Sequence, residues 1–310
     1  MNKKVSVILP AYNESGNITV IAKRLDEVFA SLPYDHELLF IDDGSSDHTM
    51  EILQAMHKDD PKLHYIELSR NFGHQNALKA GLDLADGDCI ISMDCDLQHP
   101  PELIKDLLEK WEEGYEIVYT RRGDDPNLSD YKRKMSKLFY SMMNRMSDIN
   151  LEPGTADFRL IDRKVATIFQ NFSETEPFIR GLIKWLGFKQ YGINYKPDSR
   201  FAGKSSYSTK KMFRLALQGI TSFSIRPLYT AVYLGFIFSF LSILYVPYVI
   251  YSFYTGHEVV GWASVIMTIV FFGGLQLIIL GIIGIYIGKL FIQSKKRPNY
   301  IIRSTSLNNN

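Results

Sequence analysis

The chain has 310 residues, which is enough for one sizeable domain with a smaller unit or for two modest domains. Its formal net charge of +1 at pH 7 argues against a protein that coats nucleic acid, and we expect no nucleic-acid partner. The charge is distributed unevenly, since nearly all charged residues precede Pro227 and residues 228–255 and 259–288 contain no Lys, Arg, Asp or Glu.

Strands and helices alternate in the first part of the chain. The predicted strands are short apolar runs at residues 5–10, 37–41, 63–68 and 89–93. The predicted helices span residues 18–30, 47–57, 75–85 and 100–113. Asp47 is the expected N-cap of the second helix, and Pro100-Pro101 opens the fourth. This alternation predicts a parallel sheet with helices on both faces, in which ligands bind beyond the carboxyl ends of the strands.

Two acids follow the last of these strands. Asp94 and Asp96 are two residues apart, so in an extended segment both carboxylates face the same side. Such hard oxygen ligands suit Mg²⁺ or Mn²⁺, with phosphate oxygens and water completing the coordination shell. An isolated Asp-x-Asp pair is commonly a solvated loop, but its position after a buried strand favours a metal site. His99 is a further candidate ligand, although a loop histidine usually has no metal role.

Two more polar clusters follow predicted strands. Tyr12 can stack on a base, and Glu14 can accept a hydrogen bond from a ribose or a base. In Asp42-Asp43-Gly44, one acid can accept from a uracil-type N–H while the glycine permits a tight turn. Ordinary turn and helix-cap chemistry explains the same residues, so that alternative stays open.

The chain alternates less regularly after residue 115. Residues 115–198 mix strands and helices, and residues 200–208 are rich in Gly, Ser and Lys. A helix over residues 208–222 would gather its apolar residues on one side and its basic residues elsewhere. We expect this helix to lie in the membrane interface.

The two uncharged stretches are each longer than the roughly 20 residues that a helix needs to cross a bilayer. Long soluble helices usually keep a polar face, so a pair of buried core helices is the weaker alternative. Lys and Arg flank both stretches but are absent from residues 255–260 between them, which predicts that both chain ends are cytoplasmic. We expect no secretory signal at the N-terminus. Cys89 and Cys95 are accordingly expected to be packed thiols rather than a disulfide.

Four ordered motifs resemble those of a known family. They are VSVILPAYNE at residues 5–14, IDDGS at residues 41–45, RNFG at residues 70–73 and MDCDLQHPPE at residues 93–102. Together they resemble the family-2 inverting glycosyltransferases. The chain is most similar to the polyprenyl-phosphate branch, which includes dolichyl-phosphate mannose synthase and the bactoprenol glucosyltransferases of the GtrB type. The resemblance covers nearly the whole chain and implies a GT-A fold, which is Rossmann-like α/β, and a UDP-sugar donor.

The resemblance also implies a set of donor-binding residues. The nucleotide-sugar would be bound by Pro10, Ala11, Tyr12, Glu14, Asp42, Asp43, Arg70, Asp94, Cys95, Asp96, Arg200 and Lys204. The metal, Mg²⁺ or Mn²⁺, would be held by Asp94, Asp96 and Gln98. Cys95 stands where the family often has alanine, which leaves both acids intact. His74 stands where lysine or glutamine is common, so no role is assigned to it.

Residues 155–160 resemble the segment that holds the family's proposed base. Asp157, together with Asp96, is therefore the catalytic candidate. A lipid phosphate with a second pKa near 6 is already largely a dianion at neutral pH and scarcely needs deprotonation. Asp157 would then position the sugar or the acceptor, and a cap or salt-bridge partner of Arg159 is the structural alternative.

The acceptor phosphate requires positive charge near the membrane, and arginine binds phosphate with a planar fork. By resemblance, the candidates are Arg121, Arg122, Lys132, Arg133 and Ser136. Residues 200–207, with Arg200 and Lys204, match a loop that closes over the donor diphosphate. Each of these charges is also explained, by itself, as a solvated surface residue.

We therefore predict a metal-dependent hexosyltransferase of the inner (plasma) membrane. It would transfer a sugar, glucose first, with inversion from a UDP-sugar to polyprenyl (undecaprenyl) phosphate at the cytoplasmic face, for modification of lipopolysaccharide or cell wall. Its predicted parts are a GT-A domain at residues 1–207, an interfacial helix at 208–226, two transmembrane helices within 227–292 (about 228–254 and 260–288) and a cytoplasmic tail at 293–310. Expected partners are the bilayer, a downstream flippase and further copies of the chain, a tetramer by resemblance.

Three alternatives remain. The sugar could be N-acetylglucosamine, mannose, galactose or aminoarabinose. A processive polysaccharide synthase would use the same front motifs, but it normally carries a Gln-x-x-Arg-Trp segment and more spans. A non-catalytic sugar-nucleotide-binding membrane scaffold would explain the spans, but not the intact acid pair and Asp157.

Overall fold

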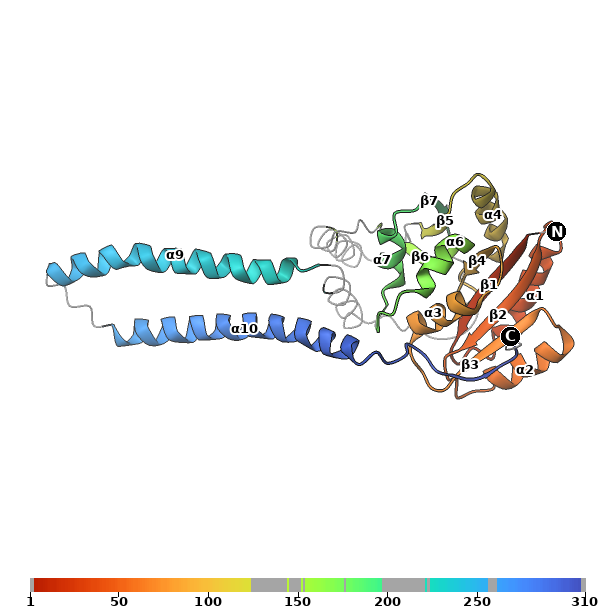
Figure 1. Cartoon of the computed structure of the whole chain (residues 1–310), viewed down its shortest axis with the longest axis horizontal. Coiled ribbons are helices and arrows are strands. Elements are labelled where there is room, and N and C mark those ends of the chain that lie inside the picture. The colour runs from red at the N-terminus through yellow and green to blue at the C-terminus, as the bar shows by residue number, and fades with distance from the viewer. Residues whose placement is uncertain are drawn as a thin grey trace.

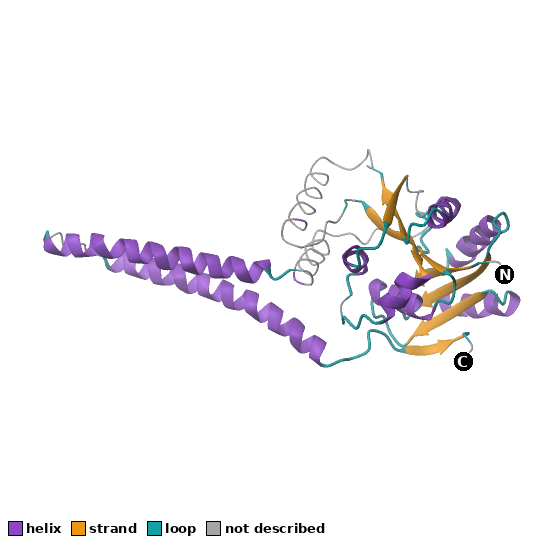
Figure 2. Ribbon diagram, turned by 45° about the horizontal axis from the view of Figure 1, so that its top comes forward, coloured by secondary structure: helices purple, strands orange, loops and turns teal. Residues whose placement is uncertain are grey.

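A computed structural model describes residues 3–123, 144, 152, 154–175, 177–196, 221, 224–255 and 261–307. An α/β domain lies at one end of the molecule, and two long helices project from it side by side (Figures 1 and 2). Several predicted features lie outside the described residues: Lys132, Arg133, Ser136, Arg200, Lys204 and most of the expected interfacial helix at 208–226.

The described strands form one sheet in the order β7-β5-β6-β4-β1-β2-β3-β8. They are β1 (Lys4–Ala11), β2 (Asp35–Asp42), β3 (Leu63–Leu68), β4 (Cys89–Ser92), β5 (Ile117–Arg122), β6 (Thr155–Asp162), β7 (Gln190–Tyr195) and β8 (Ile302–Thr305). Strands β1 to β4 pair in parallel, which confirms the prediction for the first part of the chain. Strand β6 is antiparallel to β4 and β5, and β8 is antiparallel to β3, so the whole sheet is mixed.

Helices cover both faces of the sheet (Figure 2). They are α1 (Ile18–Phe29), α2 (Thr49–Asp59), α3 (His74–Leu84), the 3₁₀ helix η1 (Pro101–Leu103), α4 (Ile104–Glu112), α6 (Arg163–Gln170) and α7 (Ile179–Trp185). One apolar cluster joins the sheet to α1, α2 and α4, and another joins it to α3, α6 and α7. The predicted N-cap of α2 is wrong by one residue: His48 holds that position, while Asp47 Oδ1 accepts from the backbone N–H of Thr49 (3.0 Å).

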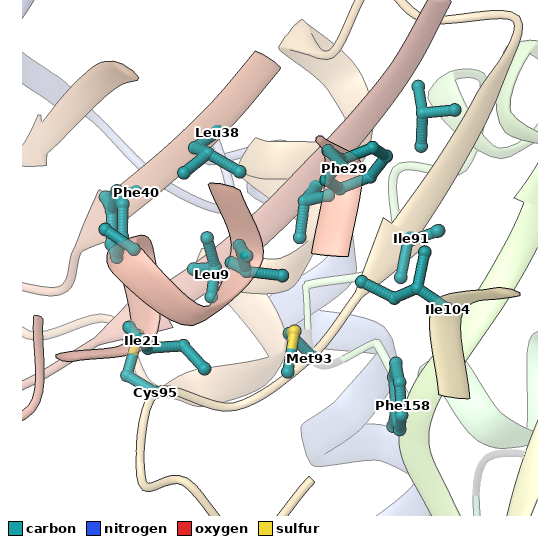
Figure 3. Close-up of a cluster of buried hydrophobic side chains, with 14 of the residues drawn as sticks. Leu9, Ile21, Phe29, Leu38, Phe40, Ile91, Met93, Cys95, Ile104 and Phe158 are labelled. Atoms are coloured by element: carbon teal, nitrogen blue, oxygen red, sulfur yellow. The ribbon is translucent and has the colours of Figure 1, made fainter. Parts of the chain in front are cut away.

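Strand β1 is buried on both faces, which explains its unbroken apolar run. Leu9 belongs to the cluster with α1 and α4, while its neighbour Ile8 belongs to the cluster under α3, as the two-residue period of a strand requires. Cys95 joins Ile21 and Met93 in the first cluster (Figure 3). Cores on both faces thus fix the strand ends, and the polar motifs follow directly from those ends.

The projecting helices are α9 (Arg226–Tyr254) and α10 (Trp262–Ser294). Among the described residues, one helix is long and apolar enough to cross a membrane: Val265–Ser294, with a mean hydropathy of 2.5 and none of its apolar window buried. The apolar stretch in α9, Arg226–Leu241, is shorter. The second predicted span therefore stays a prediction.

The segment after α10 is tied to the α/β domain. Strand β8 extends the sheet at β3, and Tyr300 Oη donates to Asp83 Oδ2 in α3 (3.0 Å). In the last turn of α10, Gln293 Nε2 donates to the carbonyl oxygen of Ser173 (2.8 Å), and Gln293 Oε1 accepts from the backbone N–H of Thr175 (3.0 Å). The predicted tail thus contains an edge strand of the sheet.

Candidate active site

A cavity of about 420 Å³ lies at the carboxyl ends of β1, β2 and β4. Nine of the predicted site residues line it: Pro10, Ala11, Tyr12, Glu14, Asp43, Asp94, Cys95, Asp96 and Asp157. Five residues line it that the sequence did not assign: Asn71, Gly73, His74, Ala77 and Arg180. Because parallel strands end at one edge of a sheet, motifs far apart in the chain meet here.

Tyr12 stands at the β1 side of the cavity with 48% of its surface exposed. The next residue, Asn13, donates its backbone N–H to Ser45 Oγ (2.8 Å), and Asn13 Oδ1 accepts from the backbone N–H of Ser46 (2.8 Å). Asn13 has a φ of 58°, a left-handed conformation that asparagine tolerates better than most residues. These hydrogen bonds join the loops after β1 and β2 and leave Tyr12 exposed, so that it can stack on a base.

Asp43 is 3% exposed, and its carboxylate holds the loop that precedes α3. Its Oδ1 accepts from the backbone N–H of Phe72 (2.7 Å), and its Oδ2 accepts from that of Gly73 (2.9 Å). Burial raises the pKa of Asp43, against the effect of these two hydrogen bonds. Each carboxylate oxygen has two lone pairs, so Asp43 can position this loop and still accept from a nucleoside N–H.

Among the described residues, two predicted donor-binding residues do not line the cavity. Asp42 is 1% exposed, and its Oδ2 accepts from the backbone N–H of Ser45 (3.2 Å), which is the turn chemistry that the sequence left open. Arg70 places its guanidinium carbon 4.1 Å from the ring centroid of Phe72 and donates to the carbonyl oxygen of Asn71 (3.0 Å). Both residues shape the loops that carry the lining residues.

Asp94 and Asp96 both line the cavity, while Cys95 between them is 2% exposed and packs into the core (Figure 3). His99 fixes the first acid, because its Nδ1 accepts from the backbone N–H of Asp94 (3.1 Å). The His99 ring also stacks on Phe158, with 5.3 Å between the ring centroids. His99 therefore supports the acid pair by binding the backbone of Asp94.

The acid pair fits a divalent metal. Asp94 Oδ1 is buried and makes no hydrogen bond among the described residues, although His74 Nε2 forms an ion pair with it at 3.5 Å. Asp96 Oδ1 accepts from the backbone N–H of Gln98 (3.1 Å), and Gln98 does not line the cavity. Within the described part of the chain, no group of three or more His, Cys, Asp or Glu is placed to hold a metal. A metal here would need phosphate oxygens and water to complete an octahedral shell.

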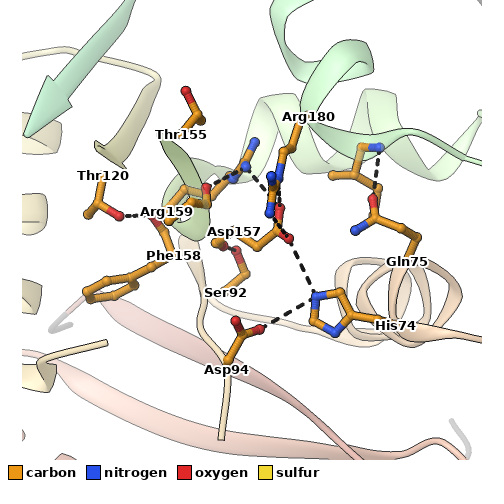
Figure 4. Close-up of polar contacts among 12 residues, drawn as sticks. His74, Gln75, Ser92, Asp94, Thr120, Thr155, Asp157, Phe158, Arg159 and Arg180 are labelled. Carbon is orange, nitrogen blue, oxygen red and sulfur yellow. Dashed lines mark hydrogen bonds and ion pairs between the residues drawn. The ribbon is translucent and has the colours of Figure 1, made fainter. Parts of the chain in front are cut away.

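Asp157, near the start of β6, is 5% exposed and is surrounded by cations (Figure 4). Arg180 donates from Nε to Asp157 Oδ1 (2.8 Å) and from Nη2 to Asp157 Oδ2 (2.7 Å), and Arg159 Nη2 donates to Oδ1 (3.1 Å). Burial alone would raise the pKa of Asp157, but Arg180, with His74 and Arg159, holds it well below its usual value. A carboxylate stabilised in this way is a weak proton acceptor.

His74 bridges Asp157 and the acid pair, although the sequence assigned it no role. Its Nε2 lies 3.5 Å from Asp94 Oδ1 and 3.5 Å from Asp157 Oδ2 (Figure 4). Burial acts to lower the pKa of His74, but the hydrogen bond to Asp157 and the charge of Asp94 outweigh it and raise this pKa to about 9. A positively charged imidazole therefore lies between the two acids at neutral pH.

The two described candidates for the acceptor phosphate lie at the end of β5. Arg121 Nη1 donates to Glu152 Oε2 (2.8 Å), and Arg121 does not line the cavity. Arg122 does not line it either. The Arg121 guanidinium is thus engaged in an ion pair, and neither arginine reaches the cavity in the described part of the chain.

The lining residues that were not predicted differ in how clearly the sequence points to them. Gly73 belongs to the RNFG segment, and its φ of 94° is a conformation that glycine adopts readily. His74 follows it as the first residue of α3. Arg180 left no signal, because it lies 23 residues beyond Asp157 in a segment without a motif, and only the packing of α7 against the sheet brings the two together.

Comparisons with known proteins agree with the motifs. The pattern of the family described as Glycosyl transferase family 2 matches residues 6–169. The "Uncharacterized glycosyltransferase YkcC" of Bacillus subtilis is 43% identical over 97% of this chain and 93% of its own length. The "Bactoprenol glucosyl transferase" of Shigella phage SfV is 39% identical over 97% of this chain and 98% of its own. A solved structure, glucosyl-3-phosphoglycerate synthase from Mycobacterium tuberculosis in complex with Mn²⁺, UDP and glucosyl-3-phosphoglycerate, is 16% identical over 71% of this chain and 78% of its own, with a TM-score of 0.48.

Proposed function

Because this chain belongs to Glycosyl transferase family 2 and is a glycosyltransferase, we propose that it transfers a sugar from a UDP-sugar to polyprenyl phosphate at the cytoplasmic face of a membrane. Glucose is the first candidate, since a relative that spans nearly the whole chain is named for bactoprenol glucosyl transfer. N-acetylglucosamine, mannose, galactose and aminoarabinose are the alternatives.

The observation that carries this proposal is the order of side chains along the carboxyl edge of the sheet. Asp43 follows β2, Tyr12 follows β1, the acid pair follows β4, and Asp157 lies beside them in β6. Strand β6 runs antiparallel to β4, so its first residues lie at this same edge. A nucleoside over β1 and β2 thus has its diphosphate at β4 and its sugar toward β6.

Mg²⁺ or Mn²⁺ would be held by Asp94 and Asp96, and when bound it would neutralise charge on the departing diphosphate. The buried Asp94 Oδ1, which makes no hydrogen bond among the described residues and has an ion pair with His74 at 3.5 Å, supports this assignment. Gln98 gives less support, because its side chain does not line the cavity. The protein's own contribution is to hold both acids on a rigid turn with Cys95 anchored in the core.

The membrane attachment follows from α9 and α10, which we place as two membrane-spanning helices. The start of α9 and the end of α10 lie toward the α/β domain, and the end of α9 and the start of α10 lie at the far end of the molecule (Figure 1). That arrangement supports the orientation expected from the Lys and Arg distribution, with the domain and both chain ends in the cytoplasm. The cavity would then be reached by a lipid head group in the inner leaflet.

Positioning supplies much of the rate increase in this proposal. A phosphate monoester with a second pKa near 6 is mostly a dianion at neutral pH and is already a nucleophile. Its oxygen attacks the anomeric carbon from the side opposite the diphosphate, the bond to the UDP oxygen breaks, and the configuration inverts. No proton needs to be removed, and holding two anions in line is what the site must achieve. The product, a polyprenyl-phosphate sugar, is then available for a flippase and for envelope modification.

The test uses purified full-length protein with UDP-glucose, Mn²⁺ and undecaprenyl phosphate in detergent. Wild type is expected to release UDP only when the lipid phosphate is present, and mass spectrometry should find the glucosylated lipid. Asp96→Asn should fall below about 1% of the wild-type rate, because removing one centre of charge stabilisation typically lowers the rate by about 10²–10³-fold.

Asp106→Asn is the matched control, since Asp106 is an exposed acid of α4 outside the cavity. Near-normal turnover of Asp96→Asn would refute the metal assignment. A wild-type protein that forms no glycolipid with any of a panel of nucleotide sugars would refute the transfer itself and favour a non-catalytic scaffold.

A further inference from the structure

We propose that Arg180 binds the phosphate group of the acceptor and that Asp157 acts through Arg180, as the residue that holds its guanidinium in place. The inference rests on the proposed function, and it names the side chain that the attacking phosphate meets. It also gives Asp157 a role other than that of the family's proposed base.

The contacts of Asp157 leave it little capacity as a base. Both of its oxygens accept hydrogen bonds from the Arg180 guanidinium, in a bidentate pair of 2.8 and 2.7 Å. Oδ1 also accepts from Arg159, and Oδ2 faces His74 Nε2 at 3.5 Å. A nucleophile that needed to give up a proton would have to displace one of these cations. The carboxylate is instead arranged to fix cations at the cavity (Figure 4).

Arg180, rather than Arg159, is the cation that reaches the cavity. The Arg159 side chain is only 3% exposed and donates to the carbonyl oxygen of Ala156 (2.7 Å). The Arg180 side chain is 24% exposed and lines the cavity. Its backbone is fixed as well, because the preceding Ile179 donates its N–H to Gln75 Oε1 (3.1 Å). A guanidinium carries five N–H donors in one plane, so it can bind a carboxylate along one edge and a second anion along another.

The position of Arg180 selects the acceptor phosphate over the donor diphosphate. In the proposed function the donor occupies the edge from β2 to β4, which has Asp43 at one end and Asp94 at the other. In-line displacement requires the nucleophile to approach from the opposite side of the sugar, which is the side of β6. Arg180 lies there on α7, paired with Asp157 of β6.

The direction of the membrane agrees with this choice. Helix α7 lies on the side of the domain from which α9 and α10 project (Figure 1). The segment before α7 is joined to the last turn of α10 by Gln293, through Ser173 and Thr175. Within the described part of the domain, α7 therefore lies on the side from which a lipid phosphate would arrive. There Arg180 offsets the repulsion between the dianionic acceptor and the diphosphate of the donor.

The experiment is steady-state kinetics on full-length protein with UDP-glucose, Mn²⁺ and undecaprenyl phosphate, varying each substrate in turn. Arg180→Gln is expected to raise the KM for undecaprenyl phosphate by about 10- to 100-fold, the range for a lost charge-assisted hydrogen bond. The KM for UDP-glucose should stay within about twofold, well below the change that such a lost bond produces. Arg180→Lys should recover part of the loss, because it keeps the charge without the fork.

Asp157→Asn tests the positioning role. It should raise the same KM, and the double variant Asp157→Asn/Arg180→Gln should be no worse than Arg180→Gln alone, because residues that act through one contact are not additive. Arg24→Gln is the control, since Arg24 pairs with Glu102 at 2.8 Å outside the cavity, and its kinetics should match the wild type.

Two results would overturn the inference. One is a raised KM for UDP-glucose in Arg180→Gln with an unchanged KM for the lipid. The other is a pair of effects that multiply in the double variant, because Asp157 would then have a role of its own. Isothermal titration of UDP checks that the variants are folded, and Arg180→Lys carries the test if Arg180→Gln is not. A wild type that forms no glycolipid refutes the proposed function instead, so the two failures are distinguishable.

Discussion

Gly44 lies where the loop after β2 meets the loop before α3. Its φ is +71°, and a Cβ atom at this position would lie 2.6 Å from the carbonyl carbon of Arg70 and 2.7 Å from the backbone nitrogen of Asn71. Backbone atoms cannot move aside as the end of a flexible side chain can. Any side chain here would therefore separate the two loops that Asp43 joins, and the cavity would change shape with them.

Gly44→Ala should therefore reduce both stability and donor binding. The left-handed conformation alone costs about 1 kcal/mol for a non-glycine residue, and the clash adds to it. We expect UDP binding, measured by isothermal titration, to weaken by about tenfold or more, since a loss of 1.4 kcal/mol is tenfold. Gly114→Ala separates the two effects, because Gly114 has a φ of +88° but nothing within 4 Å of the added Cβ. Equal binding losses in both variants would rule out the clash as the cause.

At the scale of elements, β1, β2 and the turn before β4 share a buried polar network at the end of the sheet opposite the cavity. Glu37 of β2 is 5% exposed and forms an ion pair from Oε2 to Lys4 Nζ of β1 (2.7 Å). Its Oε1 accepts from Ser6 Oγ and from the backbone N–H of Asp86 (3.1 Å). The network holds the parallel strands in register, and register sets which residues reach the cavity edge.

Glu37→Gln should make the melting temperature less dependent on pH below about pH 5. Burial acts to raise the pKa of Glu37, but Lys4, Ser6 and the Asp86 backbone outweigh it and lower this pKa below the ordinary value. A depressed folded-state pKa means that the stabilisation is complete above the unfolded-state value, near 4.3, and is lost as the pH falls toward the folded-state value. The wild-type melting temperature should therefore fall more steeply than that of the variant below about pH 5. Parallel curves in differential scanning fluorimetry would contradict this.

At the scale of the whole molecule, the chain leaves the α/β domain, runs along α9 and α10 and returns to the same sheet. Strand β8 covers the edge of β3, and Tyr300 bonds to Asp83 in α3, whose first residue is His74. The end of α10 and strand β8 are thus both bonded to the domain. Such an arrangement fixes the orientation of the cavity relative to the two helices.

A chain that ends at Arg297 should show what this strand contributes. It lacks β8 and the Tyr300 bond, so its melting temperature should fall, by about 2–4 °C for each kcal/mol lost. UDP binding should persist below the transition, because the cavity residues lie between Pro10 and Arg180, whereas transfer to undecaprenyl phosphate in liposomes should decrease. Arg303→Gln is the matched control, since it removes the ion pair with Glu67 (2.9 Å) and the hydrogen bond to the carbonyl oxygen of Ser69 (2.6 Å) but keeps strand β8 and the Tyr300 bond. Unchanged transfer by the truncated chain would show that β8 has no part in orientation.

The parallel arrangement of β1 to β4 and the meeting of Tyr12, Asp43 and Asp94 at one edge could be predicted from the sequence. These follow from local rules: an apolar run buries a strand, a polar motif at its end becomes a loop, and parallel strands end together. The long apolar stretches could also be identified from the sequence, because a run of 20 or more uncharged residues is recognised without knowing what it packs against.

The charges that meet at the site could not be predicted, because they depend on how the helices pack. Arg180 and His74 come from α7 and α3, and packing on one face of the sheet brings them to Asp157. Strand β8 closes the β3 edge from more than 200 residues away, as the Tyr300–Asp83 bond shows. An ion pair or an edge strand depends on the position of its partner in the folded structure. That position cannot be predicted from the residues that are adjacent in the sequence.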